Sequence, residues 1–268
     1  MTGSVRIGIG GWVFEPWRGT FFPKDLPQSG ELAYAAGKLT AIEINATFYG
    51  PQRPESFRRW RDETPSGFVF AVKGPRGATH RKELDEAKAT IDRFFEGGVG
   101  ELGDKLGPLM WQFPPTKRFD ADWVGPLLAH LPRELGGRKL RHAVELRHAS
   151  FDTPEAVALL REHKIARVMV DAEERPLLAD PTADFVYARL ERMEEAEPQG
   201  YPPVVLDQWA GRARRWMAGE VVDDLALAAP DAPAEAVPRD CFLFCINGAK
   251  IRAPAAAMAL IERLGKPQ

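Results

Sequence analysis

Residues 141–171 read RHAVELRHASFDTPEAVALLREHKIARVMVD, and this stretch decides the fold. It begins with the run Arg141–Arg147, in which apolar Val144 and Leu146 alternate with Glu145 and Arg147 as in a strand. A Thr-Pro pair then supplies an N-cap and a first-turn proline for a helix over Pro154–His163. A second apolar run follows over Ala166–Asp171. A strand, a helix and a strand in this order predict two parallel neighbours joined by a helical crossover.

The same alternation extends through most of the chain. Further apolar runs predict strands over Arg6–Trp12, Ala41–Thr47, Phe68–Lys73, Leu109–Phe113, Phe185–Leu190 and Phe242–Asn247. Helical patterns between them cover Glu31–Lys38, Glu55–Glu63, Glu83–Phe95, Ala121–Leu131 (after the capping residue Asp120), Leu206–Ala218 and Pro254–Leu264. With 268 residues, the chain is long enough for a TIM-like (β/α)8 barrel, which needs about 250. Eight strands therefore predict a closed barrel, and a doubly wound open sheet is the alternative.

Two parts of the chain break the pattern. Residues 172–184 are too short and too rich in Pro and Asp for a full helix, so we expect a degenerate crossover between strands 6 and 7. Residues 192–203 and 221–239 are rich in Glu, Pro, Ala and Asp, which favours a long loop and a surface insertion near 220–239. No linker divides the chain, and we expect one barrel domain over residues 1–268.

The composition argues against two classes of partner. A formal net charge of -2 gives no general basic excess for nucleic acid or an anionic membrane surface. No apolar run reaches the length of a membrane span, and no secretory signal pattern begins the chain. Cys241 and Cys245 lie in one strand, too far apart for a disulfide, and are expected to be free core thiols. We therefore expect a cytoplasmic protein without a membrane partner, while its oligomeric state cannot be inferred.

Alternation along the strands predicts where the polar residues gather. Successive side chains point to opposite faces, so one face of each strand packs beneath the helices and the other lines the barrel interior. The predicted inner face becomes polar toward the C-terminal strand ends, where barrel enzymes hold their active sites. The residues placed there are Glu43, Asn45, Lys73, Gln112, Glu145, Arg147, Asp171, Tyr187, Arg189 and Asn247.

Several motifs together resemble the YecE-like family, domain of unknown function seventy-two. They are GIGGW, WRGTFFP, AIEINATFYGP, TPSGFVFAVKGPRGATH, LGPLMWQFPP and AVELRHASF, in this order between Ile7 and about Arg189. The resemblance implies a TIM-barrel-like fold and adds Tyr49, His80 and His148 to the recurring polar residues. It supplies no substrate or cofactor, because the family has no established reaction. The chain departs from the family at Glu191-Arg192, where His-Gly is usual, and keeps only Asn247 of a frequent asparagine pair.

The charged residues favour a small polar ligand that carries a phosphate or carboxylate. Lys73, Arg147 and Arg189 would hold negative charge, since the arginine fork suits bidentate contact with an anion. Arg76 and His80 could assist from a glycine-containing loop. Asn45, Tyr49, Gln112, Tyr187 and Asn247 complete the predicted ligand-binding set. The catalytic candidates, for acid/base work of hydrolase, lyase or isomerase type, are Glu43, Glu145, His80 and Asp171.

Other interpretations remain open from the sequence. Glu43 and Glu145 could act as a carboxylate pair on a sugar, or could simply be paired with cations. A metal bound by Glu43, His80, Glu145 and Asp171 is disfavoured, because three neighbouring cationic residues would compete with the ion. A nucleic-acid-binding protein could use a basic rim, formed by Arg53, Arg58, Arg59, Arg61, Lys73, Arg76 and Arg81. In a non-catalytic scaffold, ion pairs such as Glu43–Lys73 and Asp171–Arg189 would only stabilise the barrel.

Overall fold

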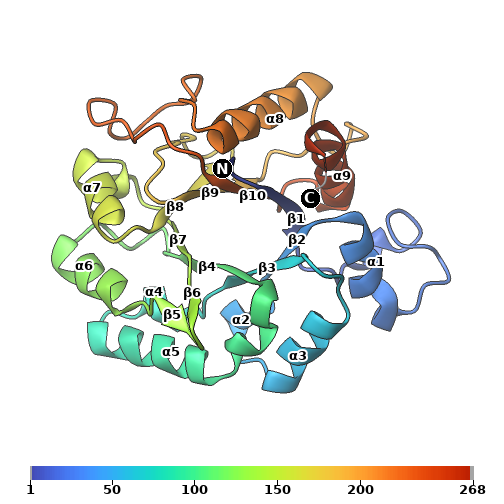
Figure 1. The fold of residues 1–268 in the computed structure, drawn as a ribbon, viewed down its shortest axis with the longest axis horizontal. Helices are drawn as coiled ribbons and strands as arrows, with labels where there is room; N and C mark the ends of the chain where they lie inside the picture. Colours follow the sequence, from blue (N-terminus) through green and yellow to red (C-terminus); the bar gives the residue numbers. More distant parts are fainter. Residues whose placement is uncertain (1, 266–268) are drawn as a thin grey trace.

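A computed structural model describes residues 2–265, and in it eight parallel strands close into a barrel that helices surround (Figure 1). The strands follow one another around the ring in chain order, and β10 pairs with β1 to close it. The predicted TIM-like barrel is confirmed, and the open sheet is wrong because no strand edge is left between the first and last strands. The bounds are β1 Val5–Gly10, β2 Ala41–Ile44, β3 Val69–Lys73, β4 Leu106–Gln112, β7 His142–Glu145, β8 Ala166–Asp171, β9 Phe185–Leu190 and β10 Asp240–Cys245.

The seven helices expected from the sequence all form. They are α1 Glu31–Lys38, α3 Pro54–Asp62, α5 Leu84–Glu96, α6 Ala121–His130, α7 Pro154–Glu162, α8 Pro203–Ala218 and α9 Ala253–Leu264. The Thr153 hydroxyl accepts from the backbone N–H of Ala156 at 3.3 Å, and the Asp120 carboxylate caps α6 in the same way from Asp122. Sequence periodicity missed the smallest elements: α2 Ala46–Tyr49, α4 Gly77–His80, the β5 Glu134–Leu135/β6 Arg138–Lys139 hairpin, and 3-10 turns at Glu15–Trp17, Gln28–Gly30, Val99–Lys105, Ala149–Phe151 and Lys250–Arg252.

The connection between β8 and β9 has no helix, as the sequence predicts. The buried carboxylate of Asp180 in this connection accepts from the backbone N–H groups of Ala228 and Ala229, at 2.8 and 3.0 Å. Those residues lie in the extended segment 219–239, which also forms a parallel bridge between Ala226 and Leu178. The segment that follows α8 therefore covers the place where a crossover helix is missing.

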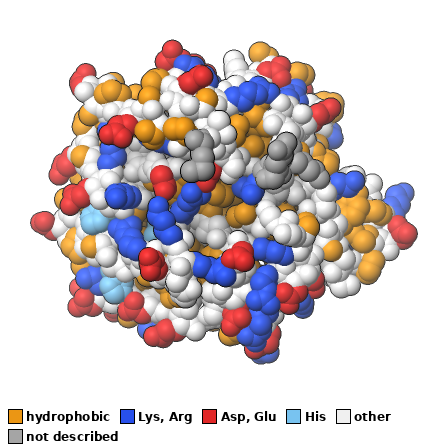
Figure 2. Space-filling model, in the orientation of Figure 1, with side chains coloured by type: hydrophobic (Ala, Val, Ile, Leu, Met, Phe, Trp, Pro, Cys, Tyr) orange, Lys and Arg blue, Asp and Glu red, His pale blue; other side chains and the backbone are white. Residues whose placement is uncertain are grey.

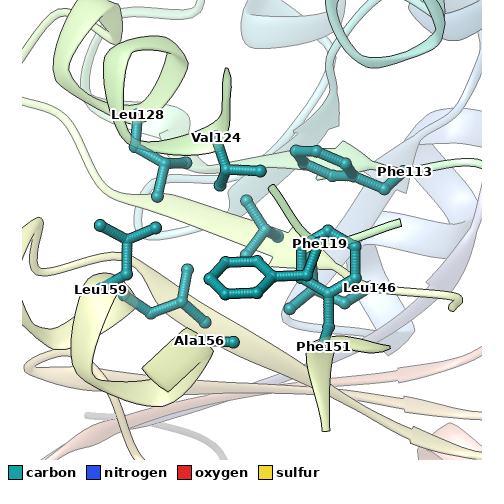
Figure 3. A pocket seen from close by; sticks show the side chains of 10 residues that line it. Phe113, Phe119, Val124, Leu128, Leu146, Phe151, Ala156 and Leu159 are labelled. Atoms are coloured by element: carbon teal, nitrogen blue, oxygen red, sulfur yellow. The ribbon is translucent and has the colours of Figure 1, made fainter. Parts of the chain in front are cut away.

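Two apolar layers hold the barrel together. Residues such as Ile42, Trp111 and Val186 face the helices, whereas Ala71, Met110 and Phe242 belong to a separate cluster inside the ring. Between α6 and α7, Figure 3 shows Val124, Leu128, Ala156 and Leu159 pointing toward Phe113, Phe119 and Phe151. The gap that these side chains leave is too small for a water molecule, and we assign it to core packing. Within residues 2–265, no helix is long and apolar enough to cross a membrane.

Alternation fails to give the correct inner face for β8 and β10. Val168 pairs with Tyr187 and Val170 with Arg189, so the valines point into the barrel and Asp171 points toward the helices. In β10, Phe242 and Phe244 lie inside the ring, and Cys245 packs in the outer layer. The expectation that Asp171 lines the inner face is therefore wrong. Both faces of these strands are apolar over most of their length, so alternation cannot show which face lines the barrel interior.

Candidate functional site

A cavity of about 510 Å³ opens at the C-terminal ends of the strands. This volume lies in the range of small-molecule sites. We call it the mouth cavity. Its polar lining consists of Asn45, Tyr49, Lys73, Gln112, Arg147, Arg189, Asn247 and Lys250, and its aromatic lining includes Trp12, Trp17 and Trp60.

The charges that line the mouth cavity have one sign. Two lysines and two arginines reach it, whereas no Asp or Glu is among its described lining residues. The structure thus brings seven of the eight predicted ligand-binding residues to one cavity. The exception is Tyr187, which is fully buried below it. None of the four predicted catalytic residues lines the cavity.

Glu145 lies beneath the cavity at the centre of an ionic cluster, which comprises Glu43, Glu145, Arg147, Arg175, Arg189 and Glu191. One carboxylate oxygen of Glu145 accepts from Arg147 Nε at 2.6 Å, and the other accepts from Arg189 at 2.6 Å and from Gln112 Nε2 at 3.0 Å. Burial alone would raise the pKa of Glu145, but Arg189 and Arg147 outweigh it and hold the pKa at about 2. A carboxylate so firmly ionised holds the guanidinium groups in place and is a weak general acid or base.

Glu43 occupies the other side of the same arginine. Its carboxylate lies 3.4 Å from an Arg189 nitrogen and accepts a 2.5 Å hydrogen bond from the Tyr187 hydroxyl. Glu43 and Glu145 are both fully buried and share one guanidinium, so they do not face each other across open space. Arg189 also pairs with Glu191 at 2.9 Å, while its buried Nε has no acceptor within the described chain.

Lys73 differs from the arginines because no carboxylate neutralises it directly. Its side chain is 6 % exposed, and its Nζ lies over the ring of Phe48 at 4.0 Å from the centroid. Among residues 2–265 it has neither a salt bridge nor a side-chain hydrogen bond. Burial and the nearby Arg189 lower the pKa of the ammonium to about 8. The expected Glu43–Lys73 ion pair is therefore wrong.

Two one-turn helices fix the strand ends beneath the cavity. The hydroxyl of Thr47 in α2 donates to the carbonyl of Lys73 at 2.6 Å, and that of Thr79 in α4 donates to the carbonyl of Gln112 at 2.6 Å. A side chain at Gly74 would place its Cβ 2.3 Å from the ring of Trp111, so glycine lets the backbone after Lys73 pass close to this ring. These contacts fix the backbone at Lys73 and Gln112, at the C-terminal ends of β3 and β4.

His80 and Asp171 lie away from the cavity. His80 Nδ1 is 3.0 Å from the Thr79 hydroxyl, and its ring packs edge-on against Phe48. Asp171 contacts Tyr201 at 3.4 Å and Arg192 at 3.7 Å in the layer between β8 and α8. The expected Asp171–Arg189 pair does not form, since the two side chains point to opposite sides of the sheet.

Two basic residues of the site were not predicted from the sequence. Lys250 follows β10 in a 3-10 turn, and its Nζ lies over Phe14 and Trp17. Arg175 comes from the helix-free connection after β8 and lies 3.6 Å from Glu145. Neither lies within a predicted strand. Both follow the end of a predicted strand by a few residues, and a search for basic residues at such positions would have found them. Asn247 and Tyr49 line the cavity and are both exposed, Tyr49 to 83 %, so both stand at its rim.

The alternative sites do not gather as their hypotheses require. Within residues 2–265, no three His, Cys, Asp or Glu residues are close enough to hold a metal, and Asp171 points away from Glu43 and Glu145. Most of the basic rim is paired: Arg58 with Glu55 and Glu101, Arg59 with Glu63, Arg61 with Asp62, and Arg81 with Glu86. On the face seen in Figure 2, red acidic side chains also lie among the blue basic ones.

Solved structures with this fold include DUF72 family proteins. A DUF72 family protein of Thermotoga maritima is 25% identical with a TM-score of 0.73, and the alignment covers 98% of this chain and 100% of that chain. One from Enterococcus faecalis is 16% identical with a TM-score of 0.70, over 97% and 95% of the two chains. A GH5_18 protein of Streptomyces cattleya, solved with GlcNAc, shares only the fold, at 13% identity and a TM-score of 0.56, over 98% and 80% of the two chains.

Sequence comparison with curated proteins gives shorter matches. UPF0759 protein YecE of Escherichia coli strain K12 is 29% identical over 116 residues, or 43% of this chain and 41% of that protein. UPF0759 protein YunF of Bacillus subtilis strain 168 is 31% identical over 116 residues, or 41% and 40%. The matched stretch thus spans about two fifths of these relatives. The family described as protein of unknown function DUF72 matches residues 6–268, and the chain belongs to this family.

Proposed function

We propose that the mouth cavity binds a small ligand bearing a phosphate or carboxylate. The observation that carries this proposal is the sign of the lining charges, which come from lysine and arginine alone among the described residues. An anion entering such a cavity meets fixed donors in a partly desolvated space, where charge-assisted hydrogen bonds are strong.

The two arginines and the two lysines contribute differently. Glu145 neutralises part of the charge of Arg147 and Arg189 but also holds both guanidinium groups in place, so little ordering is needed when a ligand binds. Lys73 and Lys250 have no carboxylate salt-bridge partner among the described residues, so their positive charge is not neutralised by direct pairing. Guanidinium groups that are already held in place, next to ammonium groups without a carboxylate partner, support recognition of a phosphate or a carboxylate.

Catalysis of hydrolase, lyase or isomerase type remains part of the proposal. The buried, paired positions of Glu43 and Glu145 support a role in positioning Arg189 and Arg147 over a direct role in proton transfer. Nucleic acid is less well supported as a ligand, because most arginines of the basic rim are paired with acidic side chains.

Binding of inorganic phosphate, sulfate, small carboxylates and phosphorylated sugars to the purified protein tests the proposal by calorimetry and thermal unfolding. A ligand present at about 100 times its Kd adds about 2.7 kcal/mol of stability. Lys73→Ala and Arg147→Ala should each weaken binding about 10- to 100-fold, the worth of one hydrogen bond to a charged group.

Arg214→Ala is the matched control, because this exposed arginine of α8 lies outside the cavity lining and donates to the backbone carbonyl of Arg263 in α9. It should bind every anion as the unaltered protein does. If no anion on the panel binds, or if Arg214→Ala weakens binding as much as Lys73→Ala does, the mouth cavity is not an anion site.

A further inference from the structure

Lys73 combines three features that the anion site alone does not require. Its Nζ faces the aromatic ring of Phe48 without a carboxylate partner among the described residues. It reaches the mouth cavity from the end of β3, while remaining almost completely buried. Arg147 and Arg189 line the same cavity and add positive charge around it. A desolvated amine beside other cations is the arrangement that makes a lysine nucleophilic.

We propose that Lys73 forms an imine with a small aldehyde or ketone that carries a phosphate or carboxylate. This inference rests on the anion site proposed above and names the reactive group of its ligand. Arg147 and Arg189 would hold the anionic group, and the carbonyl carbon would meet Nζ. The volume of about 510 Å³ accommodates a ligand with both groups.

The electrostatics of the cavity supply the neutral amine that attack requires. Burial and Arg189 lower the pKa of Lys73 to about 8, against 10.5 for an ordinary lysine. At pH 7 about one Lys73 side chain in ten is then neutral, whereas about one in three thousand would be neutral at the ordinary pKa. Lys250 also has a lowered pKa through burial, so it is the natural competitor in a test.

The step balances without any further reagent. The nitrogen lone pair forms a bond to the carbonyl carbon, and the carbonyl π electrons move to oxygen, which takes up a proton to give a carbinolamine. Loss of the hydroxyl group as water, assisted by the proton that the ammonium had released to solvent before the attack, then leaves a protonated carbon–nitrogen double bond. The net change converts one ammonium and one carbonyl into one protonated imine and one water, and hydrolysis reverses it. The cationic imine then withdraws electrons from the neighbouring ligand carbon.

Reductive trapping tests the proposal on the intact 268-residue chain. Glyoxylate and glycolaldehyde phosphate are the anionic probes, and uncharged glycolaldehyde is the reference. Sodium borohydride reduces any imine to a stable secondary amine, which intact-mass and peptide mass spectrometry then locate. We expect one adduct per chain, at Lys73, formed about tenfold or more faster than at any other lysine. Sulfate should slow the trapping, and uncharged glycolaldehyde should react more slowly.

Two variants make the result specific. Lys73→Arg keeps the charge and removes the amine, so it should lose the fast adduct and keep measurable sulfate binding. Lys82→Arg, at an exposed lysine outside the cavity, should trap as the unaltered protein does. Fast trapping at Lys250, or equal trapping across all lysines while sulfate still binds, overturns the imine and leaves the anion site standing. Fast trapping at Lys73 by glycolaldehyde alone, without any sulfate binding, overturns the anion site instead.

Discussion

Lys73 is the residue whose ionisation should control ligand binding. Its pKa of about 8 means that the free protein loses this positive charge as the pH rises through that value. Sulfate is a suitable probe because its own charge does not change between neutral and alkaline pH. We expect sulfate affinity to be highest below pH 8 and to fall about 10- to 100-fold above it. Calorimetry in buffers of different ionisation enthalpy should also detect proton uptake on binding near pH 8.

Lys73→Arg provides the control for this pH dependence. Arginine stays charged across the range, so the alkaline loss of affinity should disappear in the variant. A sulfate affinity that falls equally in both proteins would assign the effect to another group, and Lys250 would be the first candidate because burial also lowers its pKa.

The same lysine should reduce the stability of the fold. A folded-state pKa below the ordinary 10.5 means that folding disfavours the protonated form. The cost is therefore complete below pH 8 and disappears as the pH rises through 10.5. Lys73→Met keeps most of the side-chain volume without the charge, and at pH 7 we expect it to raise the free energy of unfolding by about 1–3 kcal/mol.

Urea unfolding at pH 7 and above pH 10 measures this gain, which should shrink at the higher pH. Sulfate binding by the same variant should be weak, so stability and binding change in opposite directions. A Lys73→Met protein that is less stable than the unaltered one at pH 7 would instead support the scaffold interpretation, in which the interior charges only stabilise the barrel.

At the scale of elements, the strands were predictable because both their composition and their spacing are distinctive. The inner face was predictable only where one face of a strand carries a clear polar group. Glu43 in β2, Lys73 in β3 and Glu145 in β7 provide such a group. In β8 the inward residues are valines, and the polar Asp171 points outward to Tyr201. Only the register with β9 reveals this, and register depends on pairing between distant segments.

Asp171→Ala tests the corrected orientation of β8. The substitution removes the carboxylate that contacts Tyr201 and Arg192 in the layer under α8. We expect the free energy of unfolding to fall by about 1–2 kcal/mol, the worth of hydrogen bonds to one buried polar group. Sulfate affinity should not change, because Asp171 does not line the mouth cavity. A variant of normal stability with altered sulfate affinity would return Asp171 to the barrel interior.

At the scale of the whole molecule, the chain closes a complete ring although one crossover lacks its helix. The segment 219–239 compensates, since its backbone N–H groups bond to Asp180 in the helix-free connection. Sequence composition identified both stretches as irregular but could not show that one covers the other, because they are separated by β9 and α8. The same connection supplies Arg175 to Glu145, which links this irregular side of the barrel to the ionic cluster.

Stability of the whole molecule should depend on two buried groups below neutral pH. His142 is buried, with Nδ1 accepting from Trp111 and Nε2 close to the carbonyl of Pro132, and burial lowers its pKa to about 4. Its contribution is complete above the unfolded pKa of 6.5 and is lost as the pH falls from 6.5 to 4. Glu145 affects stability at lower pH. Its stabilising contribution is present above pH 4.5 and is lost as the pH falls toward 2.

Acidification should therefore destabilise the fold in two successive ranges, by about 3 kcal/mol for each group. Urea unfolding followed by tryptophan fluorescence, at intervals from pH 7 to pH 3, measures the first range. His142→Gln cannot ionise, so it should be less stable at pH 7 but should show a flatter dependence between pH 6.5 and 4.5. An equally steep loss in the variant would mean that groups other than His142 take up the protons in this range.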